Sequence, residues 1–351
     1  MKILVISLAG IGDTLFATPL IHELRVNFPA ATIDALVMWP GAKDLLEGNP
    51  HINRVFQKNL IKAGRPAAVS FLRSLRKNGY DISINTHPQS RIHYRIAAWL
   101  AGAQTRISHE YECGGILDRW LVNKTLPQDY TKHAVENNLA TLHLMGGSRK
   151  LPAHELEIVL TADEQKWADD FLVQNHLAGK PWLGVHVGSG GTKNLALRRW
   201  PLANYIELAR RLQAELNLPV LFFGGPEEQQ DHEKIRRDFP AAIFPPTKNI
   251  RQVAAVVRRA HGFLSVDTAL MHIAAAMKVP KQVVIETPTW NKPIEPFGNP
   301  FTLVKNPAVA GRNLEFYRYD GGDIKGTRAE IIAAMQSVKV TDVFEVVAQL
   351  V

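Results

Sequence analysis

An acidic residue follows the first apolar segment of the chain at a glycine turn. The sequence there reads Leu8-Ala9-Gly10-Ile11-Gly12-Asp13-Thr14-Leu15. The glycines permit a tight turn that places Asp13 at a helix start, where the positive end of the helix dipole favours an ionised carboxylate. Such a carboxylate can accept a proton from an attacking hydroxyl group. Asp13 is therefore a candidate general base, although an aspartate that only caps the helix would occupy the same position.

A glycine-rich loop in the second half of the chain is a candidate phosphate-binding segment. It reads Gly188-Ser189-Gly190-Gly191-Thr192-Lys193 and follows the apolar run Trp182–Val187. Exposed backbone N–H groups and the Ser189 and Thr192 hydroxyls can donate hydrogen bonds to phosphate oxygens. Lys193 and Arg198 can neutralise charge on a departing diphosphate. A flexible surface loop would have a similar composition, so this loop alone does not establish the site.

The segment Ser265–Ala276, SVDTALMHIAAA, gives the stronger signal for phosphate binding. A buried strand ends here, and a helix of small residues begins at Ala269. Asp267 or Thr268 is expected to cap the N-terminus of that helix. The free N–H groups and the dipole at its N-terminus can receive a phosphate. His272 lies one turn further along the same face. Because no other histidines or carboxylates stand at ligand spacing around His272, we expect no metal there.

A third junction of this kind is Phe223-Gly224-Gly225-Pro226-Glu227-Glu228. Acidic residues in a first helical turn are favourable on dipole grounds alone. Glu228 could also reach a ribose or sugar hydroxyl, with Glu227 as the alternative. A purely structural role is at least as well supported by the sequence.

These loops interrupt a regular alternation of apolar strand-like runs and amphipathic helical stretches. This alternation predicts parallel sheets covered by helices, an α/β fold. The predicted strands are 2–8, 32–37, 80–85, 182–187, 219–223, 242–244, 262–266 and 282–285. The predicted helices are 15–27, 68–77, 161–177, 202–216, 228–238, 251–259 and 269–277.

Two consecutive doubly wound domains of similar size follow from this pattern, residues 1–170 and 171–351. The helix over Thr161–Leu177 bridges them, and a return of the C-terminal helix to the first domain is left open. Ligands of such sheets bind beyond the carboxyl ends of the strands. With two such domains, the expected site is the cleft between them.

Composition narrows the class of protein and its partners. The 351 residues are 46% hydrophobic and carry a net charge of +8. No apolar run approaches the roughly 18 residues needed to span a bilayer, and the N-terminus lacks the features of a signal peptide. The single cysteine, Cys113, excludes an internal disulfide framework and favours a reducing cytoplasm.

Basic residues concentrate in the first half of the chain. Residues 51–100 contain nine lysines and arginines against one acidic residue, Asp81. This excess suggests an anionic partner such as a membrane surface or a phosphorylated glycan, although a solvated basic face would look the same. Nucleic acid is the weakest option, because no recognisable nucleic-acid-binding motif is present.

Taken in order, these segments resemble glycosyltransferase family 9, the ADP-heptose:lipopolysaccharide heptosyltransferases. The resemblance spans residues 1–285 and rests on the segments GIGDTLFATPLIHELRVNFP, FLRSLRKNGYDISINTH, GVHVGSGG, RRWPLANYIELARRL, GGPEE and SVDTALMHIAAAM. Each segment alone is unspecific, whereas their combination is specific.

The resemblance implies a GT-B fold, in which two Rossmann-like domains face a central cleft. The first domain would bind the acceptor and the second the nucleotide sugar. It implies an inverting displacement without metal or cofactor, in which heptose passes from ADP-heptose to the lipopolysaccharide inner core at the cytoplasmic face of the inner membrane. Asp13 would be the catalytic base. The acceptor-binding residues would be Gly12, Thr14 and Arg91, and the donor-binding residues Ser189, Thr192, Lys193, Arg198, Glu228, Asp267, Thr268, Ala269 and His272.

Three departures from the family pattern concern the donor side. Ala269 stands where glycine is common in the family. Its methyl group leaves slightly less room for a phosphate to approach the backbone. Arg198 stands where lysine is frequent; it keeps the charge but changes the reach. The segment Glu286–Lys292 departs from the usual phenylalanine-glycine-proline-threonine pattern, which leaves the donor's identity open.

Other functions remain compatible with parts of the sequence. The acceptor could be a protein, the donor could be another nucleotide sugar, or the chain could be a non-catalytic scaffold that binds nucleotides or glycans. A dinucleotide-dependent oxidoreductase is disfavoured, because Leu15 occupies the position of the third small residue in the dinucleotide fingerprint.

Overall fold

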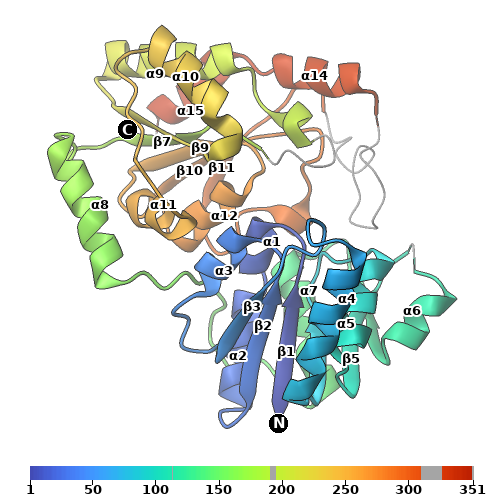
Figure 1. Ribbon diagram of the computed structural model, residues 1–351. Helices are drawn as coiled ribbons and strands as arrows, with labels where there is room; N and C mark the ends of the chain where they lie inside the picture. Colours follow the sequence, from blue (N-terminus) through green and yellow to red (C-terminus); the bar gives the residue numbers. More distant parts are fainter. Residues whose placement is uncertain (113, 190–194, 310–325, 350–351) are drawn as a thin grey trace. The chain divides into compact units, whose positions relative to one another are not determined.

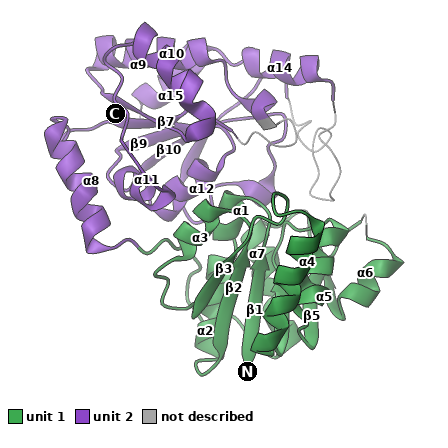
Figure 2. Ribbon diagram, in the orientation of Figure 1, with its two compact units in different colours: residues 1–159, 319–322 green, residues 160–318, 323–351 purple. Residues whose placement is uncertain are grey.

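The computed structural model describes residues 1–112, 114–189, 195–309 and 326–349. The chain forms two compact units, which are Met1–Val159 and the described residues from Leu160 onward (Figure 2). Each unit is an α/β structure built on a parallel sheet (Figure 1). The α/β class predicted from the alternation of strands and helices is therefore confirmed.

The first unit contains a six-stranded sheet in the order β3-β2-β1-β4-β5-β6. Its strands are β1 (Lys2–Ser7), β2 (Thr32–Val37), β3 (Arg54–Gln57), β4 (Ile82–Asn85), β5 (Thr105–Glu110) and β6 (Lys124–Pro127). Its helices are α1 (Ile11–Leu15), α2 (Thr18–Asn27), α3 (Pro40–Leu46), α4 (Arg65–Ser74), α5 (Ile92–Ala101), α6 (Ile116–Leu121) and α7 (Ala134–Ala140), with 3-10 turns η1 (Leu75–Asn78) and η2 (Thr141–Met145).

The second unit contains a five-stranded sheet in the order β11-β10-β9-β7-β8. Its strands are β7 (Leu183–His186), β8 (Val220–Phe223), β9 (Gly262–Ser265), β10 (Lys281–Ile285) and β11 (Phe301–Val304). Its α-helices are α8 (Ala162–Gln174), α9 (Leu202–Leu216), α10 (Gln229–Asp238), α11 (Ile250–Val257), α12 (Ala269–Ala276), α14 (Arg328–Gln336) and α15 (Val340–Ala348). Its 3-10 turns are η3 (Leu195–Arg198), η4 (Pro226–Glu228) and η5 (Lys292–Ile294).

In each sheet, the direction in which successive strands are added reverses once. In the first sheet the chain runs outward from β1 to β3 and then returns to place β4 on the other side of β1. In the second sheet it runs from β7 to β8 and returns to place β9 on the other side of β7. Such topological switch points leave a crevice at the carboxyl ends of the two adjacent strands, which is where doubly wound sheets bind ligands.

Two predicted elements differ from the observed ones for reasons of proline chemistry. The helix predicted over 15–27 begins only at Thr18, as α2, and the separate short helix α1 ends at Leu15. Pro19 stands in the first turn of α2, where its missing N–H costs nothing. The strand predicted over 242–244 is only an isolated bridge between Leu221 and Ile243. Pro240 and the pair Pro245-Pro246 flank it and cannot donate to a ladder.

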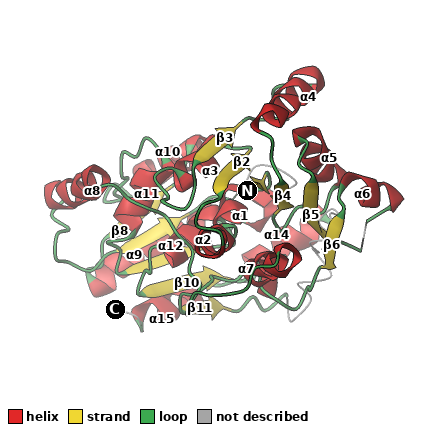
Figure 3. Ribbon diagram, turned by 90° about the horizontal axis from the view of Figure 1, so that it is seen from below, coloured by secondary structure: helices red, strands yellow, loops and turns green. Residues whose placement is uncertain are grey.

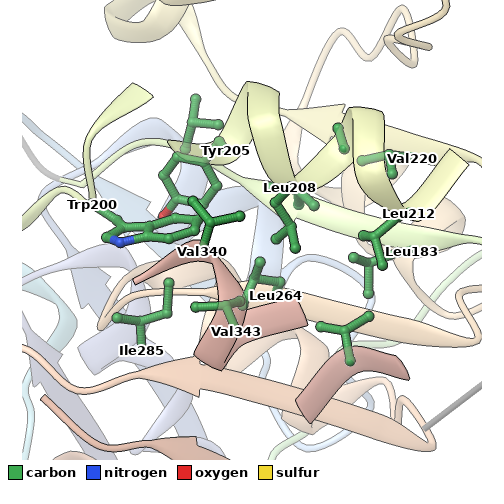
Figure 4. Packing of buried hydrophobic residues seen from close by; sticks show 14 of the residues in the cluster. Leu183, Trp200, Tyr205, Leu208, Leu212, Val220, Leu264, Ile285, Val340 and Val343 are labelled. Carbon is green, nitrogen blue, oxygen red and sulfur yellow. The ribbon is translucent and has the colours of Figure 1, made fainter. Parts of the chain in front are cut away.

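The core of the second unit anchors the residues that precede α9. Trp200 is fully buried, donates from Nε1 to the carbonyl of Val338 at 2.9 Å, and packs edge-to-face on Tyr205 (Figure 4). Val340 and Val343 of α15 join the same core. The C-terminal helix, whose return to the first domain was left open, thus packs within the second unit, because its apolar face belongs to this core.

The units divide between Val159 and Leu160, before α8, whereas the sequence analysis places the boundary after residue 170. Helix α8 is held to α11 by two arginine–carboxylate pairs: Arg251 binds Glu164 at 2.6 and 2.7 Å, and Arg259 binds Asp169 at 2.7 and 3.0 Å. These contacts assign the whole of α8 to the second unit.

Candidate functional site

The first candidate half-site lies at the switch point of the first sheet. Strands β1 and β4 are direct neighbours, and Ile6 pairs with Asn85 near their carboxyl ends. Asp13 follows β1, and Arg91 follows β4 as the residue that precedes α5. The topology therefore places two residues predicted from the sequence at one edge of the sheet, where a ligand is expected.

Asp13 is fixed by the backbone of its own turn. Gly10 is the N-cap of α1 and Asp13 the third helical residue, whose Oδ2 accepts a hydrogen bond from the Gly10 N–H at 2.7 Å. A Cβ at position 10 would lie 2.8 Å from that oxygen. Gly10 has a φ of −85°, which any residue adopts, so glycine is required here for space rather than for backbone conformation. Asp13 is therefore not the N-cap residue itself, but its carboxylate caps the helix start from the third helical position.

Thr14 and Gly12 belong to the interior of this turn. Thr14 is fully buried; its Oγ1 donates to the Gly10 carbonyl at 3.1 Å, and Ser7 Oγ lies 3.4 Å from it. Gly12 is also buried. In this structure the Thr14 hydroxyl therefore stabilises the turn that carries Asp13. The acceptor contact that the resemblance implies for Thr14 stays a prediction.

Helix α5 adds a hydroxyl and a cation to the first half-site. Burial raises the pKa of the half-buried Tyr94 hydroxyl; the Asp13 carboxylate raises it further, whereas the Arg91 guanidinium lowers it. These opposed effects show that Tyr94 lies within electrostatic range of both residues. Tyr94 was not predicted, because it stands on a helix with no motif around it. Its neutral hydroxyl can hydrogen-bond a ligand beside Asp13.

The second candidate half-site lies at the switch point between β7 and β9. Arg198, at the end of η3, donates from Nη1 to Asp267 Oδ2 at 2.5 Å and to Thr289 Oγ1 at 2.8 Å. Arg198 and Asp267 are each about 7% exposed. Burial raises the pKa of Asp267, and the Arg198 guanidinium works against that rise. The two predicted residues thus form a buried ion pair at the end of β9.

The N-terminus of α12 keeps its backbone donors available for a ligand. Thr268 is the N-cap, yet its side chain makes no capping hydrogen bond, because its Oγ1 lies 3.0 Å from His186 Nδ1. Burial, followed by Arg199 and His232, lowers the pKa of His186 to about 3, so this imidazole is neutral. An N-terminus whose cap residue is engaged elsewhere can direct its free N–H groups at an anion.

Ala269 and His272 lie on this helix as predicted. Ala269 is its half-buried first residue, and His272 is buried one turn further on.

Arg199 connects two of the predicted donor-binding segments. Its guanidinium donates to Glu228 Oε1 at 2.9 Å, to the Ser189 carbonyl at 2.9 Å and to Asp231 Oδ2 at 3.1 Å. Glu228 Oε2 also accepts the Gly225 N–H at 2.9 Å. Burial raises the pKa of Glu228, while the Gly225 N–H and Arg199 lower it. Glu228, the residue that makes these contacts, is buried, whereas Glu227 is exposed.

Glycine is again required where a carboxylate packs on the backbone. A Cβ at Gly188 would lie 2.4 Å from Glu228 Oε1. Glycine at position 188 therefore lets the backbone pack directly against the Glu228 side chain. Two further residues predicted for this loop, Thr192 and Lys193, lie outside the described residues.

Three contributors to the second half-site were not predicted: His186, Arg199 and Thr289. Arg199 stands beside the predicted Arg198, and the sequence alone does not say which of the pair faces Asp267 and which faces Glu228. Thr289 belongs to the segment that departs from the family pattern. All of its neighbours from Glu286 to Asn291 are buried, so this segment forms part of the interior beside Arg198.

Comparisons with known proteins agree with this arrangement. The sequence profile described as Glycosyltransferase family 9 (heptosyltransferase) matches residues 68–314. Lipopolysaccharide heptosyltransferase 3 from Escherichia coli is 25% identical over 281 residues, covering 77% of this chain and 78% of that protein. Lipopolysaccharide heptosyltransferase 2 from Salmonella typhimurium is 24% identical over 302 residues, covering 80% of this chain and 81% of that protein.

Solved structures share the fold over the whole chain. A family 9 glycosyltransferase from Veillonella parvula has a TM-score of 0.77 at 20% identity, covering 99% of this chain and 96% of that one. The E. coli ADP-heptose heptosyltransferase II has a TM-score of 0.71 at 18% identity, covering 100% and 98%. E. coli WaaC, solved with ADP-2-deoxy-2-fluoro heptose, has a TM-score of 0.71 at 17% identity and is covered completely, as is this chain. The two-sheet architecture is thus the GT-B fold of these enzymes.

Proposed function

The chain belongs to glycosyltransferase family 9, the heptosyltransferases, and from this membership we propose that it transfers heptose from ADP-heptose to the lipopolysaccharide inner core, with Asp13 as general base. Its relatives include lipopolysaccharide heptosyltransferases, and similar structures were solved with ADP or an ADP-heptose analogue. One observation carries the proposal. The residues suited to activate the acceptor lie at the switch point of the first sheet, and those suited to bind the donor lie at the switch point of the second.

The first unit supplies the group that activates the acceptor. The Asp13 carboxylate takes the proton from an acceptor hydroxyl as its oxygen attacks the anomeric carbon of the heptose. The bond between that carbon and the diphosphate oxygen breaks, and attack from the opposite face inverts the configuration. The hydrogen bond from Gly10 holds one carboxylate oxygen, which fixes the direction of the other. Arg91, which follows β4, is suited to bind an acidic group of the acceptor.

The second unit supplies groups that stabilise the departing ADP. The N-terminus of α12, beginning at Ala269, offers backbone N–H groups to a phosphate. Arg198 brings a guanidinium to the same strand end, held in place by Asp267 and Thr289. Glu228, oriented by Arg199, is suited to accept a hydrogen bond from a ribose or sugar hydroxyl. Negative charge developing on the leaving diphosphate therefore meets fixed donors.

The identity of the donor is testable by ligand-induced stabilisation. We expect ADP and ADP-heptose to raise the melting temperature of the full chain, because a ligand that binds only the folded state stabilises it by mass action. At a hundredfold excess over Kd the stabilisation is about 2.7 kcal/mol, or several degrees. UDP- and GDP-sugars at equal concentration serve as controls.

A rise in melting temperature with only a UDP- or GDP-sugar would reject ADP-heptose as the donor. Because the segment Glu286–Lys292 departs from the family pattern, this is the part of the proposal that the donor panel tests most directly. Product formation on isolated core oligosaccharide then tests the acceptor, and transfer to a protein but not to the oligosaccharide would favour the protein alternative.

Exposed apolar side chains on α5 and α6 suit an acceptor held in a membrane. The helices α4, α5 and α6 lie side by side (Figures 1 and 3). Trp120 on α6 is 80% exposed, and its neighbours Ile116 and Leu117 are also mostly exposed. On α5, an exposed apolar stripe consists of Ile92, Ile96 and Trp99. Helix α4 adds the exposed Arg65 and Arg73. Apolar side chains beside arginines are typical of a surface that contacts an anionic bilayer.

In the described parts of the chain, no helix combines the length and apolarity that a bilayer span requires. From the exposed apolar side chains of α5 and α6 and the arginines beside them, we propose that the first unit rests on the inner face of the membrane through the α5–α6 surface. Replacing Trp120 with glutamate is expected to weaken binding to phosphatidylglycerol-containing vesicles by at least about tenfold, because the burial of one large apolar side chain is lost. Vesicle co-sedimentation measures this.

The matched control for Trp120→Glu is Val173→Glu on α8. Val173 is also strongly exposed, at 61%, but belongs to the second unit. Equal losses in the two variants would mean that added negative charge, rather than the α5–α6 surface, reduces binding. An unchanged affinity in Trp120→Glu would reject this surface.

A further inference from the structure

Three potential metal ligands converge in the first unit, at a place that the transfer reaction does not use. His22 lies on α2, His51 lies between α3 and β3, and Glu157 lies near the end of the unit. His22 Nδ1 is 2.6 Å from Glu157 Oε1, and His51 Nε2 is 3.8 Å from Glu157 Oε2. One ligand atom from each residue lies within 4.8 Å of the other two.

We propose that His22, His51 and Glu157 bind a zinc ion that ties the end of the first unit to α2. Two imidazole nitrogens and one carboxylate oxygen form a known zinc ligand set, with a fourth position open for water. Imidazole-rich sites suit zinc better than magnesium or calcium, which prefer oxygen ligands. These three residues stand so far apart in the chain that they form no motif in the sequence.

Zinc binding requires only a local change in the two imidazole rings. They are stacked, with centroids 3.8 Å apart and planes inclined by 17°, so a single ion cannot lie in both ring planes while the rings keep this arrangement. Because zinc sits about 2.0 Å from each nitrogen, its ligand atoms are roughly 3.3 Å apart, and the rings must tilt toward a common point. The side chains of His22, His51 and Glu157 are 28%, 18% and 23% exposed, which leaves room for this tilt and an open path for the ion.

Neighbouring groups already orient the ligands. Asn49 Nδ2 donates to Glu157 Oε2 at 3.4 Å, and Asn49 Oδ1 accepts a hydrogen bond from the backbone N–H of His51 at 2.8 Å. Thr18 Oγ1 accepts the Glu157 N–H at 3.0 Å. Such outer contacts fix ligand positions in metal sites. The positive charge of Arg25 lies nearby and would repel a bound zinc ion. Its guanidinium is directed at backbone carbonyls, including that of His51 at 3.2 Å.

The position of the cluster separates it from the candidate base. His51 precedes β3 and therefore lies toward the amino-end edge of the sheet, whereas Asp13 follows the carboxyl end of β1. Glu157 stands two residues before Val159, the last residue of the main segment of the unit. The ion would thus stabilise the segment through which the chain leaves the first unit, and it would take no part in the transfer step.

The test is zinc binding by the full chain without an affinity tag. After metal is removed with a chelator and the chelator by gel filtration, titration with ZnCl2 is followed by calorimetry, and bound metal is measured by mass spectrometry. We expect one zinc ion per chain and a melting temperature raised by about 5 °C at saturation. His51→Asn and Glu157→Gln should each weaken binding at least tenfold, since even the loss of an outer contact costs about that much.

The control variant is His143→Ala, which removes an exposed histidine from the same unit and should bind zinc like the unaltered chain. Absence of zinc binding, or binding that is equal in all four proteins, would overturn the proposal. Circular dichroism establishes that each variant is folded. Visible absorption of the cobalt-loaded chain, expected to be lost in both His51→Asn and Glu157→Gln, reports the ligand set independently of stability. None of these measurements involves glycosyl transfer, so they are decided separately from the proposed function.

Discussion

Asp13→Asn is expected to lower the rate of heptosyl transfer by about 10²- to 10⁴-fold, the usual contribution of a general base. Asparagine has nearly the same shape, and its Oδ1 can still accept the Gly10 N–H that Asp13 accepts at 2.7 Å. The turn and α1 should therefore persist, while the group that removes the acceptor proton is lost. Single-turnover rates with saturating donor and acceptor measure the effect on the chemical step.

The comparison with Asp13→Ala separates catalysis from capping. Alanine also removes the hydrogen bond to Gly10, so this variant should lose about 1 kcal/mol of stability as well as transfer, whereas Asp13→Asn should lose transfer alone. Calorimetric affinity for ADP should be unchanged in both, because the proposed donor residues belong to the second unit. Transfer by Asp13→Asn within about threefold of the unaltered chain would show that the carboxylate only caps α1.

The fold was predictable because strands buried in parallel sheets have a strong sequence signal. β1, β2, β10 and the helix α9 appear where continuous apolar runs or a long amphipathic period occur. Weaker signals led to omissions. The strand β3, Arg54–Gln57, is partly exposed and contains two polar residues among its four, and α6, Ile116–Leu121, has no buried face. Edge elements of this kind have no periodicity from which to predict them.

The candidate site was predictable only as far as single loops specify it. Asp13, Arg198 and Asp267 follow strands or precede helices, and such junctions are visible in the sequence. The partners of these residues come from other strands. Thr289 follows β10 and Arg199 reaches Glu228 after β8, so both contacts depend on the order of strands in the sheet. The burial of Thr14 could not be predicted for the same reason, since it follows from packing that the loop sequence does not specify.

Arg198→Ala is expected to reduce both the stability of the second unit and the rate of transfer. The substitution leaves the Asp267 carboxylate buried without the guanidinium that now lies 2.5 Å away. Removing one member of a buried ion pair typically costs about 3 to 5 kcal/mol. Loss of a cation that stabilises a leaving diphosphate costs about 10²- to 10³-fold in rate. Urea denaturation and single-turnover transfer measure the two effects.

The double variant Arg198→Met with Asp267→Asn distinguishes a structural role of Arg198 from a role in transfer. Methionine has a similar length and asparagine carries no charge, so the uncompensated carboxylate disappears and most of the lost stability should return. The transfer rate should stay at least about 100-fold low, because no guanidinium faces the departing diphosphate. If the double variant regained both stability and transfer, Arg198 would serve only to neutralise Asp267. The charge that balances ADP would then have to come from elsewhere, with the N-terminus of α12 as the remaining candidate among the residues described.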